Sequence, residues 1–371
     1  MRFLTPLLKR SPQNAIIFRF ALVCSLAFLT CNEDDPFYPT IRYPGAEAQN
    51  IDSEQLSHAI DTLAKINGIK SIVLGRKGVI AAEEHYNDGG ADVIHDVRSV
   101  TKSVMGLLIG IAIREGFIHS VDQTVGEFLI GTILDSLEVE KAQISIKQLL
   151  TMSCGLEWHE LDGGNSYDQW YWSGDHINWV LNQPFIHTPG NGFNYNTGST
   201  HLLSVILTLA TGETALDFAR TYLFEPLGIV ESDWATLPQD ERFSNGGAGL
   251  KISPHAMFVI GSLVLNGGRW LQKQVVPSAW VTECTSIHNM TNDYNPYGTN
   301  YGYLWWIGQA HGRDHFFAMG WGGQFIVCIP DHDLVVVATC NWRGVSDNEA
   351  RQHWYDIFIV IMDNILTAVR E

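Results

Sequence analysis

The sequence predicts an α/β (α+β) fold in which both ends of the chain contribute strands to one sheet and a mainly helical lobe lies between them. Strand patterns occur near both ends of the chain, at residues 70–74, 79–85, 301–308, 324–329 and 334–340. Helical periodicity dominates about residues 120–245. Helices are also expected before the first strand and after the last one, so the termini should meet at the same sheet.

The composition allows a large core and limits the partners. The chain has 371 residues, of which 46% are hydrophobic, so a disordered or fibrous protein is excluded. Its formal net charge is −17. A surface of this charge repels phosphate backbones, which argues against nucleic acid as a partner.

The first thirty residues have the pattern of an export signal. A basic stretch ends at Arg19, and residues 20–29 are apolar and uncharged, about the length of a signal core and too short to span a bilayer. Cys31 and the acids that follow it resemble a bacterial lipoprotein signal, in which the cysteine is acylated. An ordinary signal peptide with an incidental cysteine is the alternative. Either pattern predicts an extracytoplasmic protein, and the first adds a lipid anchor in a membrane, in the periplasm or at the cell surface.

The folded part is expected at residues 51–371, after a tether at 31–50 that is rich in Pro, Asp and Asn. It opens with a helix that Ser53 caps and Gly68 ends, followed by the hairpin of strands 70–74 and 79–85.

A second helix is predicted over residues 99–115. It is apolar on nearly every side between residues 104 and 113, which is typical of a helix inside a domain. This helix should lie at the centre of the fold.

The remaining elements follow the same patterns. Helices are predicted in the lobe at residues 146–152, 176–182, 200–211 and 215–223, and after it at 254–266 and 348–369. Four isolated cysteines remain outside the signal, and their spacing forms neither a disulfide framework nor a metal pair. We therefore expect small buried thiols at Cys154, Cys284, Cys328 and Cys340.

Ser99 and Lys102 stand where the chain enters the central helix. Residues three apart share one helix face, so the amine can reach the hydroxyl. A serine becomes nucleophilic when a base removes its proton, and an amine does this only when it is neutral. Burial and the positive end of the helix dipole both lower a lysine pKa, so the apolar run after Lys102 suits this chemistry. The alternative is that Ser99 only caps the helix.

Two further segments carry candidate chemistry. Tyr195 lies in a loop rich in Gly and Asn ahead of an apolar helix, where its phenol could serve as a proton relay or base beside a lysine ammonium. The alternative is an ordinary half-buried tyrosine. Residues 319–325 hold three glycines and lead into a strand, which indicates a bulge or the close approach of a ligand to the backbone. An N–H offered there, together with that of Ser99, would form a two-donor oxyanion hole.

Together these motifs resemble the serine β-lactamase and penicillin-binding-protein superfamily, in its class C-like branch. The matching residues are Ser99-x-x-Lys102, Tyr195 in the setting Pro-Gly-x-x-Phe-x-Tyr, and Gly320-x-Gly-Gly-Gln. The branch includes D-alanyl-D-alanine carboxypeptidases, esterases and aminohexanoate-oligomer hydrolases. The resemblance covers about residue 50 to the end and implies an antiparallel sheet flanked by terminal helices, with an inserted helical lobe and the site between them.

The resemblance also implies roles for single residues. Ser99 is acylated, Lys102 and Tyr195 manage its proton, and Tyr195 helps to activate the deacylating water. The second oxyanion N–H comes from Trp321, between Gly320 and Gly322. No metal and no organic cofactor is implied. His159-Glu160 lacks the second histidine of a zinc motif, and the pair His311 and His315 is expected to lie in a loop.

Departures from the family pattern bear on the substrate. The family motif is Tyr-x-Asn. In this sequence Thr197 stands at the position of the motif's asparagine, and the asparagine, Asn196, stands one residue earlier. Ala318 replaces the cation that recognises the carboxylate of a penicillin or a D-alanine terminus, unless Arg343 or His315 restores that charge.

These changes favour a small-molecule or peptide-like substrate with an ester or small amide bond over a β-lactam or a D-alanyl-D-alanine peptide. We expect an aromatic, uncharged cleft that Trp321 and Tyr167 face. β-Lactamase or carboxypeptidase activity, and a non-catalytic binding or sensing module of the same fold, remain the alternatives.

Overall fold

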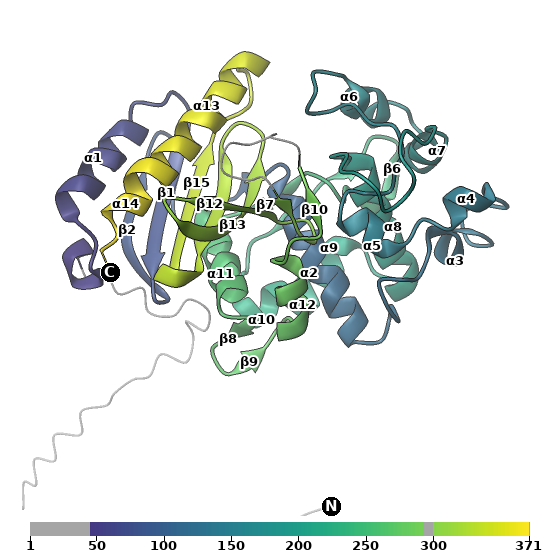
Figure 1. Ribbon diagram of the computed structural model, residues 1–371, viewed down its shortest axis with the longest axis horizontal. Helices are drawn as coiled ribbons and strands as arrows, with labels where there is room; N and C mark the ends of the chain where they lie inside the picture. Colours follow the sequence, from purple (N-terminus) through teal and green to yellow (C-terminus); the bar gives the residue numbers. More distant parts are fainter. Residues whose placement is uncertain (1–44, 292–299, 371) are drawn as a thin grey trace, which may run out of the picture. The chain divides into compact units, whose positions relative to one another are not determined.

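The computed structural model describes residues 45–291 and 300–370, and its fold is the one that the sequence predicts. Among the described residues, the main sheet has eight strands, and all its neighbouring pairs are antiparallel (Figure 1). In spatial order they are β10 (Asn289–Met290), β11 (Asn300–Tyr301), β12 (Trp306–Ala310), β13 (Arg313–Gly320), β14 (Gln324–Ile329), β15 (Leu334–Cys340), β1 (Ile69–Arg76) and β2 (Val79–His85). Because β1 pairs with β15, both ends of the chain build this sheet.

Helices cover both faces of the sheet. On β14, the ring of Phe325 lies 5.1 Å from that of Phe358 in α13 (Asp347–Ile359). The next residue, Ile326, lies against Gly261 of α11 (Pro254–Leu265). Since successive strand residues point to opposite faces, α13 and α11 lie on opposite faces of the sheet. This two-sided burial explains why β14 and β15 are almost entirely apolar and are buried throughout.

The terminal helices pack together on the α13 side. Helix α1 (Ser53–Leu63) contacts the π-helical turn η4 (Val360–Ile365), which continues α13 and leads into α14 (Leu366–Ala368). An isolated bridge between Ile51 and Val369 joins the two ends. The closing helix predicted over 348–369 is therefore confirmed, with a π turn in its last third.

Two predictions near the end of the sheet were wrong. The strand expected at 301–308 is divided, because the N–H of Gly302 bonds to the carbonyl of Trp305 and closes a turn between β11 and β12. The segment around 311–315 was expected as a loop. Only His311 and Gly312 form the turn, both with positive φ, and the chain then continues as β13.

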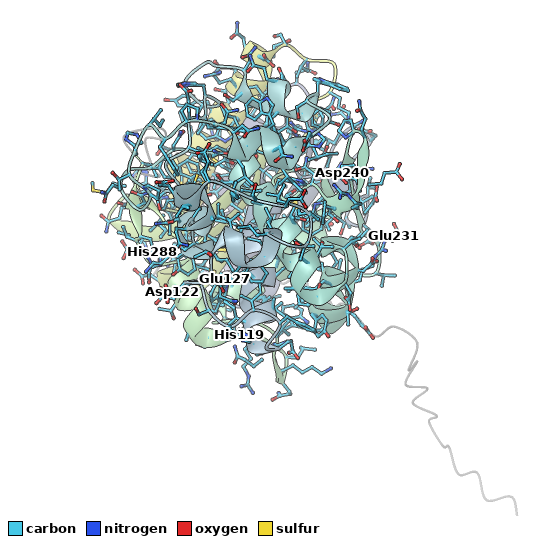
Figure 2. All side chains as sticks on the ribbon, turned by 90° about the vertical axis from the view of Figure 1, so that its right-hand side faces the viewer. His119, Asp122, Glu127, Glu231, Asp240 and His288 are labelled. Carbon is cyan, nitrogen blue, oxygen red and sulfur yellow. The ribbon has the colours of Figure 1, made fainter. Side chains whose placement is uncertain are left out.

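The inserted segment forms the helical lobe, as expected. Its helical elements are α3 (Val125–Leu129), α4 (Val139–Ala142), α5 (Ile146–Leu150), α6 (Ser166–Tyr171), α7 (His176–Leu181), α8 (Thr197–Thr211), α9 (Ala215–Ala219), η2 (Arg220–Phe224) and α10 (Glu225–Leu227). Figure 2 looks onto this side, where Asp122, Glu127 and Glu231 contribute negative charge to an exposed surface.

Helix α2 (Val100–Arg114) joins the sheet to the lobe. It packs against β13 on one side and α8 on the other, and every residue from Val100 to Ala112 is buried. The prediction of a central, buried helix is confirmed. Its start is held by a small sheet in the order β3 (His95–Asp96), β7 (Leu250–Ile252) and β4 (Asp233–Trp234).

Shorter elements complete the described part of the chain. These are η1 (Ala46–Gln49), α12 (Ser278–Cys284), η3 (Pro330–His332) and the hairpins β5 (Thr236–Leu237) with β6 (Asp240–Ser244) and β8 (Arg269–Trp270) with β9 (Lys273–Gln274). The four cysteines expected as buried thiols are free and buried: Cys154, Cys284, Cys328 and Cys340.

The signal peptide at 1–30, the lipid anchor on Cys31 and most of the tether at 31–50 lie outside the described residues, so they stay predictions. In the described residues, no single helix has the length and apolar character needed to cross a membrane. The bent pair formed by Thr197–Thr211 and Ala215–Leu227 meets those two criteria only when taken together.

A buried histidine in the lobe predicts an acid-sensitive stability. The ring of His201 is fully buried and lies 5.5 Å from that of Trp170. Burial, with a smaller contribution from His176, lowers the pKa of His201 to about 3, while Asp240 opposes the shift. Below about pH 6.5 the unfolded chain therefore binds a proton that the folded chain excludes, and stability falls as the pH falls. Denaturant unfolding between pH 7 and 4 should show roughly 1 kcal/mol per pH unit more loss of stability in the wild type than in His201→Gln. Equal pH dependence of stability in the two proteins would contradict the lowered pKa of His201.

Candidate active site

Ser99 lies at the start of α2, on a turn that the small sheet fixes. The N–H of Val97 bonds to the carbonyl of Leu250, and the N–H of Arg98 bonds to a carboxylate oxygen of Asp96. Arg98 takes a left-handed φ of 50°, which is unfavourable for a residue with a side chain. Within the described part of the chain, the Ser99 side chain makes no capping hydrogen bond, so the reading of Ser99 as a simple helix cap is not supported.

Lys102 is a buried amine next to the Ser99 hydroxyl. Its Nζ lies 3.0 Å from Ser99 Oγ and 2.8 Å from the carbonyl oxygen of Gly247, and the residue is 1% exposed. Burial lowers the pKa of Lys102 to about 8; the charge of Arg98 adds to this and that of Glu160 opposes it. At pH 7 about one molecule in ten then carries a neutral amine, which can accept the hydroxyl proton.

The Gly247 carbonyl holds the amine, and this position tolerates no side chain. A Cβ at Gly247 would lie 2.5 Å from Thr197 Cγ2 and 2.7 Å from the hydroxyl oxygen of Thr200. The N–H of Gly247 bonds to the side chain of Asn245. The glycine run at 246–249 therefore allows a backbone oxygen to approach Lys102 closely.

Tyr195 lies beside Lys102. Lys102 Nζ is 4.8 Å from the centre of the Tyr195 ring, which stacks on Trp306 at 5.7 Å. Burial raises the pKa of Tyr195 well above its ordinary value; the charge of Glu160 adds to this, while the Ser99 hydroxyl opposes it. The phenol thus stays protonated near neutral pH, so it can relay a proton but is not present as a phenolate base.

Gly320 ends β13 against the turn that carries Ser99. A Cβ at Gly320 would lie 2.3 Å from the carbonyl oxygen of Val97, so only glycine allows this approach. The hairpin to β14 continues through Trp321 and through Gly322, whose φ is 76°. The glycines stand at the end of one strand, not only before the next as the sequence suggested. An oxyanion hole formed by the N–H groups of Ser99 and Trp321 stays a prediction.

Asn196 and Thr197 face the interior of the lobe. The side-chain oxygen of Asn196 caps α8 by accepting from the N–H of Ser199, and the Thr197 hydroxyl donates to Glu160 at 2.8 Å. Both residues are fully buried, and neither is among the described residues that line the cleft. Substrate binding by these two residues stays a prediction.

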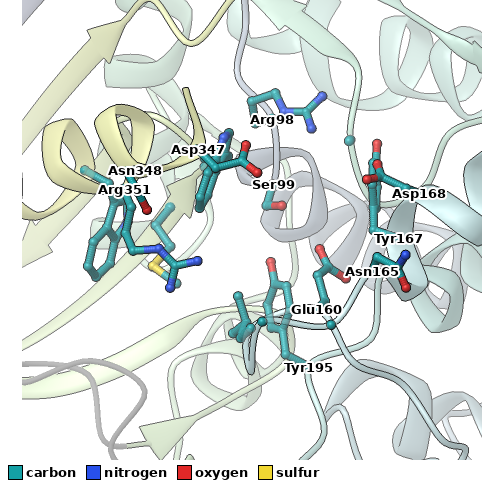
Figure 3. A pocket seen from close by; sticks show the side chains of 18 of the residues that line it. Arg98, Ser99, Glu160, Asn165, Tyr167, Asp168, Tyr195, Asp347, Asn348 and Arg351 are labelled. Carbon is teal, nitrogen blue, oxygen red and sulfur yellow. The ribbon is translucent and has the colours of Figure 1, made fainter. Parts of the chain in front are cut away.

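The cleft at Ser99 has a volume of about 790 Å³ and charged walls (Figure 3). Trp321 and Tyr167 line it, as predicted. The expectation of an uncharged cleft was wrong, because five charged side chains also line it. These are Arg98, Glu160, Asp168, Asp347 and Arg351.

Neither residue considered as a replacement for the cation lost at Ala318 supplies it. His315 is 2% exposed within the sheet, and the exposed side chain of Arg343 lies 3.8 Å from Asp96. Neither is among the described residues that line the cleft. The positive charge in the cleft comes instead from Arg98, directly before Ser99, and from Arg351 of α13.

Four contributors to the site were not predicted from the sequence: Gly247, Arg98, Glu160 and Arg351. The glycine run at 246–249 was a usable signal for Gly247, and Arg98 adjoins the serine motif. Glu160 and Arg351 carried no signal, because only tertiary packing brings them to the cleft. Across residues 45–291 and 300–370, no group of three or more His, Cys, Asp or Glu side chains is placed to hold a metal ion.

Comparison with known proteins places these features in a family. The sequence profile of the Beta-lactamase family matches residues 58–359. A 6-aminohexanoate-dimer hydrolase of Paenarthrobacter ureafaciens is 28% identical over 331 residues, covering 80% of this chain and 78% of the relative. A lovastatin esterase of Penicillium rubens is 27% identical over 133 residues, covering 34% and 32%.

The fold has close counterparts among solved structures. One, from Bacillus anthracis, carries the provisional name 6-aminohexanoate-dimer hydrolase. It superposes with a TM-score of 0.68 at 20% identity and covers 88% of each chain. At this identity the likeness establishes the fold.

The lowered pKa of Lys102 predicts how the reactivity of Ser99 depends on pH. Because only the neutral amine accepts a proton, the rate of Ser99 modification by a fluorophosphonate probe should rise with pH and reach half its maximum near pH 8. Lys102→Met should abolish this rise of the labelling rate with pH and lower the rate by about 100-fold or more. A wild-type rate that is flat between pH 6 and 9 would contradict this role.

The close approach of Gly320 predicts a second effect. In Gly320→Ala the new Cβ meets a backbone oxygen, so the end of β13 must move away from the Ser99 turn. We expect a stability loss of roughly 1–3 kcal/mol and a labelling rate at least about 10-fold lower in the protein that remains folded.

Gly312→Ala is the matched control, at the other end of β13. Nothing lies within 4 Å of its added Cβ, but its φ of 75° strains an alanine. This variant should lose stability and keep the labelling rate. Equal rates in both variants would contradict a role for the Gly320 approach.

Proposed function

We propose that this chain, which belongs to the Beta-lactamase family and is a serine hydrolase, hydrolyses an ester or a small amide through an acyl-enzyme on Ser99. One observation carries the proposal. The Lys102 amine is buried, has a lowered pKa and lies 3.0 Å from Ser99 Oγ at the floor of an open cleft. A base within hydrogen-bond reach of the hydroxyl is what an activated serine nucleophile requires, and Ser99 itself lines the cleft.

The first half of the reaction acylates Ser99. The neutral Lys102 amine takes the hydroxyl proton while Ser99 Oγ bonds to the substrate carbonyl carbon. The carbonyl oxygen becomes negative and accepts from the N–H groups of Ser99 and Trp321. When this intermediate collapses, the bond to the leaving group breaks, and the protonated phenol of Tyr195 donates to the departing oxygen or nitrogen. The Lys102 ammonium then returns a proton to the phenol.

The second half releases the acid. A water attacks the acyl carbon and loses a proton through Tyr195 to the neutral Lys102 amine. The bond from the acyl carbon to Ser99 Oγ breaks, and the proton held by Lys102 restores the serine hydroxyl. Protons balance over the two halves, and the net reaction is the addition of one water.

The replaced motif positions support an ester or amide rather than a β-lactam. Ala318 offers no charge to a substrate carboxylate, and Thr197 is engaged with Glu160. The relatives' names also support these bond types, since one is named a 6-aminohexanoate-dimer hydrolase and another a lovastatin esterase.

A second candidate function follows from the cleft charges. Arg98 and Arg351 line the cleft, and a guanidinium pairs well with a carboxylate. This keeps β-lactamase or D-alanyl-D-alanine carboxypeptidase activity as the alternative. The activated Ser99 argues against a purely non-catalytic module.

The location is part of the proposal. The apolar run at 20–29 and Cys31 support export and lipid anchoring outside the cytoplasm. In cells labelled with a radioactive fatty acid, the wild-type protein should take up label and Cys31→Ser should not.

Labelling and a substrate panel test the activity. A fluorophosphonate should label the wild type and leave Ser99→Ala unlabelled. Ser103→Ala is the matched control, since this buried neighbour on α2 only donates to the carbonyl of Leu304 and its loss should leave Ser99 reactive.

A panel of p-nitrophenyl esters, nitrocefin and D-alanyl-D-alanine peptides then separates the candidates. We expect turnover of esters at least about 10-fold faster than of nitrocefin. Fast nitrocefin turnover would favour the alternative, and stable labelling without turnover would favour a sensor.

A further inference from the structure

We infer that Glu160 is a positioning residue of this site: it anchors the segment that carries Tyr195 and supplies the negative charge that faces the Lys102 ammonium. The inference rests on the proposed function and adds a residue that no sequence motif contains.

The anchoring is visible in three hydrogen bonds. The indole N–H of Trp158 donates to Glu160 at 2.7 Å, and Thr197 donates through its N–H at 3.2 Å and its hydroxyl at 2.8 Å. Thr197 is the first residue of α8 and stands two positions after Tyr195. A carboxylate at the start of a 15-residue helix is also favoured by the helix dipole. Glu160 therefore fixes the point at which the Tyr195 loop becomes a helix.

The same carboxylate faces the reacting groups. In Figure 3, Glu160, Tyr195 and Ser99 point into the same part of the cleft from three different segments. A carboxylate has about four lone-pair sites, and the three donors use three of them. The geometry thus holds Glu160 in one position with its charge directed toward the site.

The other charged and titratable groups around Lys102 come from separate elements. Arg98 precedes α2 and stacks on Trp342 at 4.2 Å, so its positive charge is also held in place. The ring of Tyr195 lies next to the amine and stacks on Trp306. The ring of Tyr301 in β11 lies 5.0 Å from the same Trp306. Both phenols are neutral, because burial raises the pKa of each. Of the charged residues described around the cleft, Glu160 raises the pKa of Lys102 and Arg98 lowers it.

The two charges have opposite effects on the base. Glu160 stabilises the ammonium that forms when Ser99 loses its proton, and Arg98 destabilises it. A base that is too weak does not remove the proton, and one that is too strong is protonated at the working pH. Glu160 thus keeps a deeply buried amine basic enough to act.

The rate of Ser99 labelling by a fluorophosphonate, measured from pH 5 to 10, tests this inference. Glu160→Gln removes the charge, so the half-maximal pH should move down by roughly half a unit or more, and the plateau rate should fall. Arg98→Gln should move the midpoint up. A change that is only structural lowers the rate without shifting the two midpoints in opposite directions.

Two controls separate charge from anchoring. Asp168→Asn removes another carboxylate that lines the cleft, while Glu160 keeps its charge and its bonds to Thr197, so the midpoint should stay. Thr197→Val removes one anchoring hydroxyl and keeps the Glu160 charge, so the rate should fall at an unchanged midpoint. If Glu160→Gln does not fold, Glu160→Asp withdraws the charge by one methylene and should move the midpoint down.

The results also separate this inference from the proposed function. A midpoint in the folded Glu160 variant that equals the wild-type value, or that moves up, overturns the role of Glu160 while the wild type still labels on Ser99. Absence of Ser99 labelling in the wild type overturns the proposed function itself.

Discussion

The structure depends on one constraint, the burial of an amine beside a serine hydroxyl at the start of a helix. Moving the pKa of Lys102 from its ordinary value of 10.5 to about 8 costs on the order of 3 kcal/mol of charge stabilisation. A marginally stable protein can bear this only if the surrounding packing is extensive. Helix α2 meets that need, because it is buried from Val100 to Ala112 between the sheet and the lobe.

The topology brings distant segments to this one amine. Ser99 follows a small sheet, Tyr195 precedes α8 of the lobe, and Gly320 ends a strand that the C-terminal part of the chain adds to the sheet. Two of these contacts involve the backbone of a glycine. Gly320 lies against the carbonyl of Val97, and the carbonyl of Gly247 accepts from Lys102. Side chains would block both contacts, so glycine is required for steric reasons at these positions.

The residues that share a local motif could be predicted from the sequence. The charges that tertiary packing brings to the site could not. Ser99 and Lys102 share a helix face, so their contact follows from helix geometry alone. Tyr195 and Gly320 were found because their loops have unusual composition. Glu160 was examined only as part of an incomplete zinc motif, since an isolated acid in a loop gives no sign of what it faces. Strand β13 was missed in part because a two-residue turn at His311 and Gly312 looks, in sequence, like a longer loop.

This difference between local motifs and charges brought together by packing matters most for predicting the substrate. A missing cation at Ala318 suggested a site with little charge, yet Arg98 and Arg351 restore positive charge from other elements, and Glu160 and Asp168 add negative charge on the lobe side. Charges act through the space of a low-dielectric cleft, so their sum does not depend on which strand or helix carries them. A motif position therefore locates the proposed nucleophile and its base well, because covalent chemistry needs contact. Substrate preference is instead a property of the whole charged cleft, and a single replaced residue is a weak guide to it.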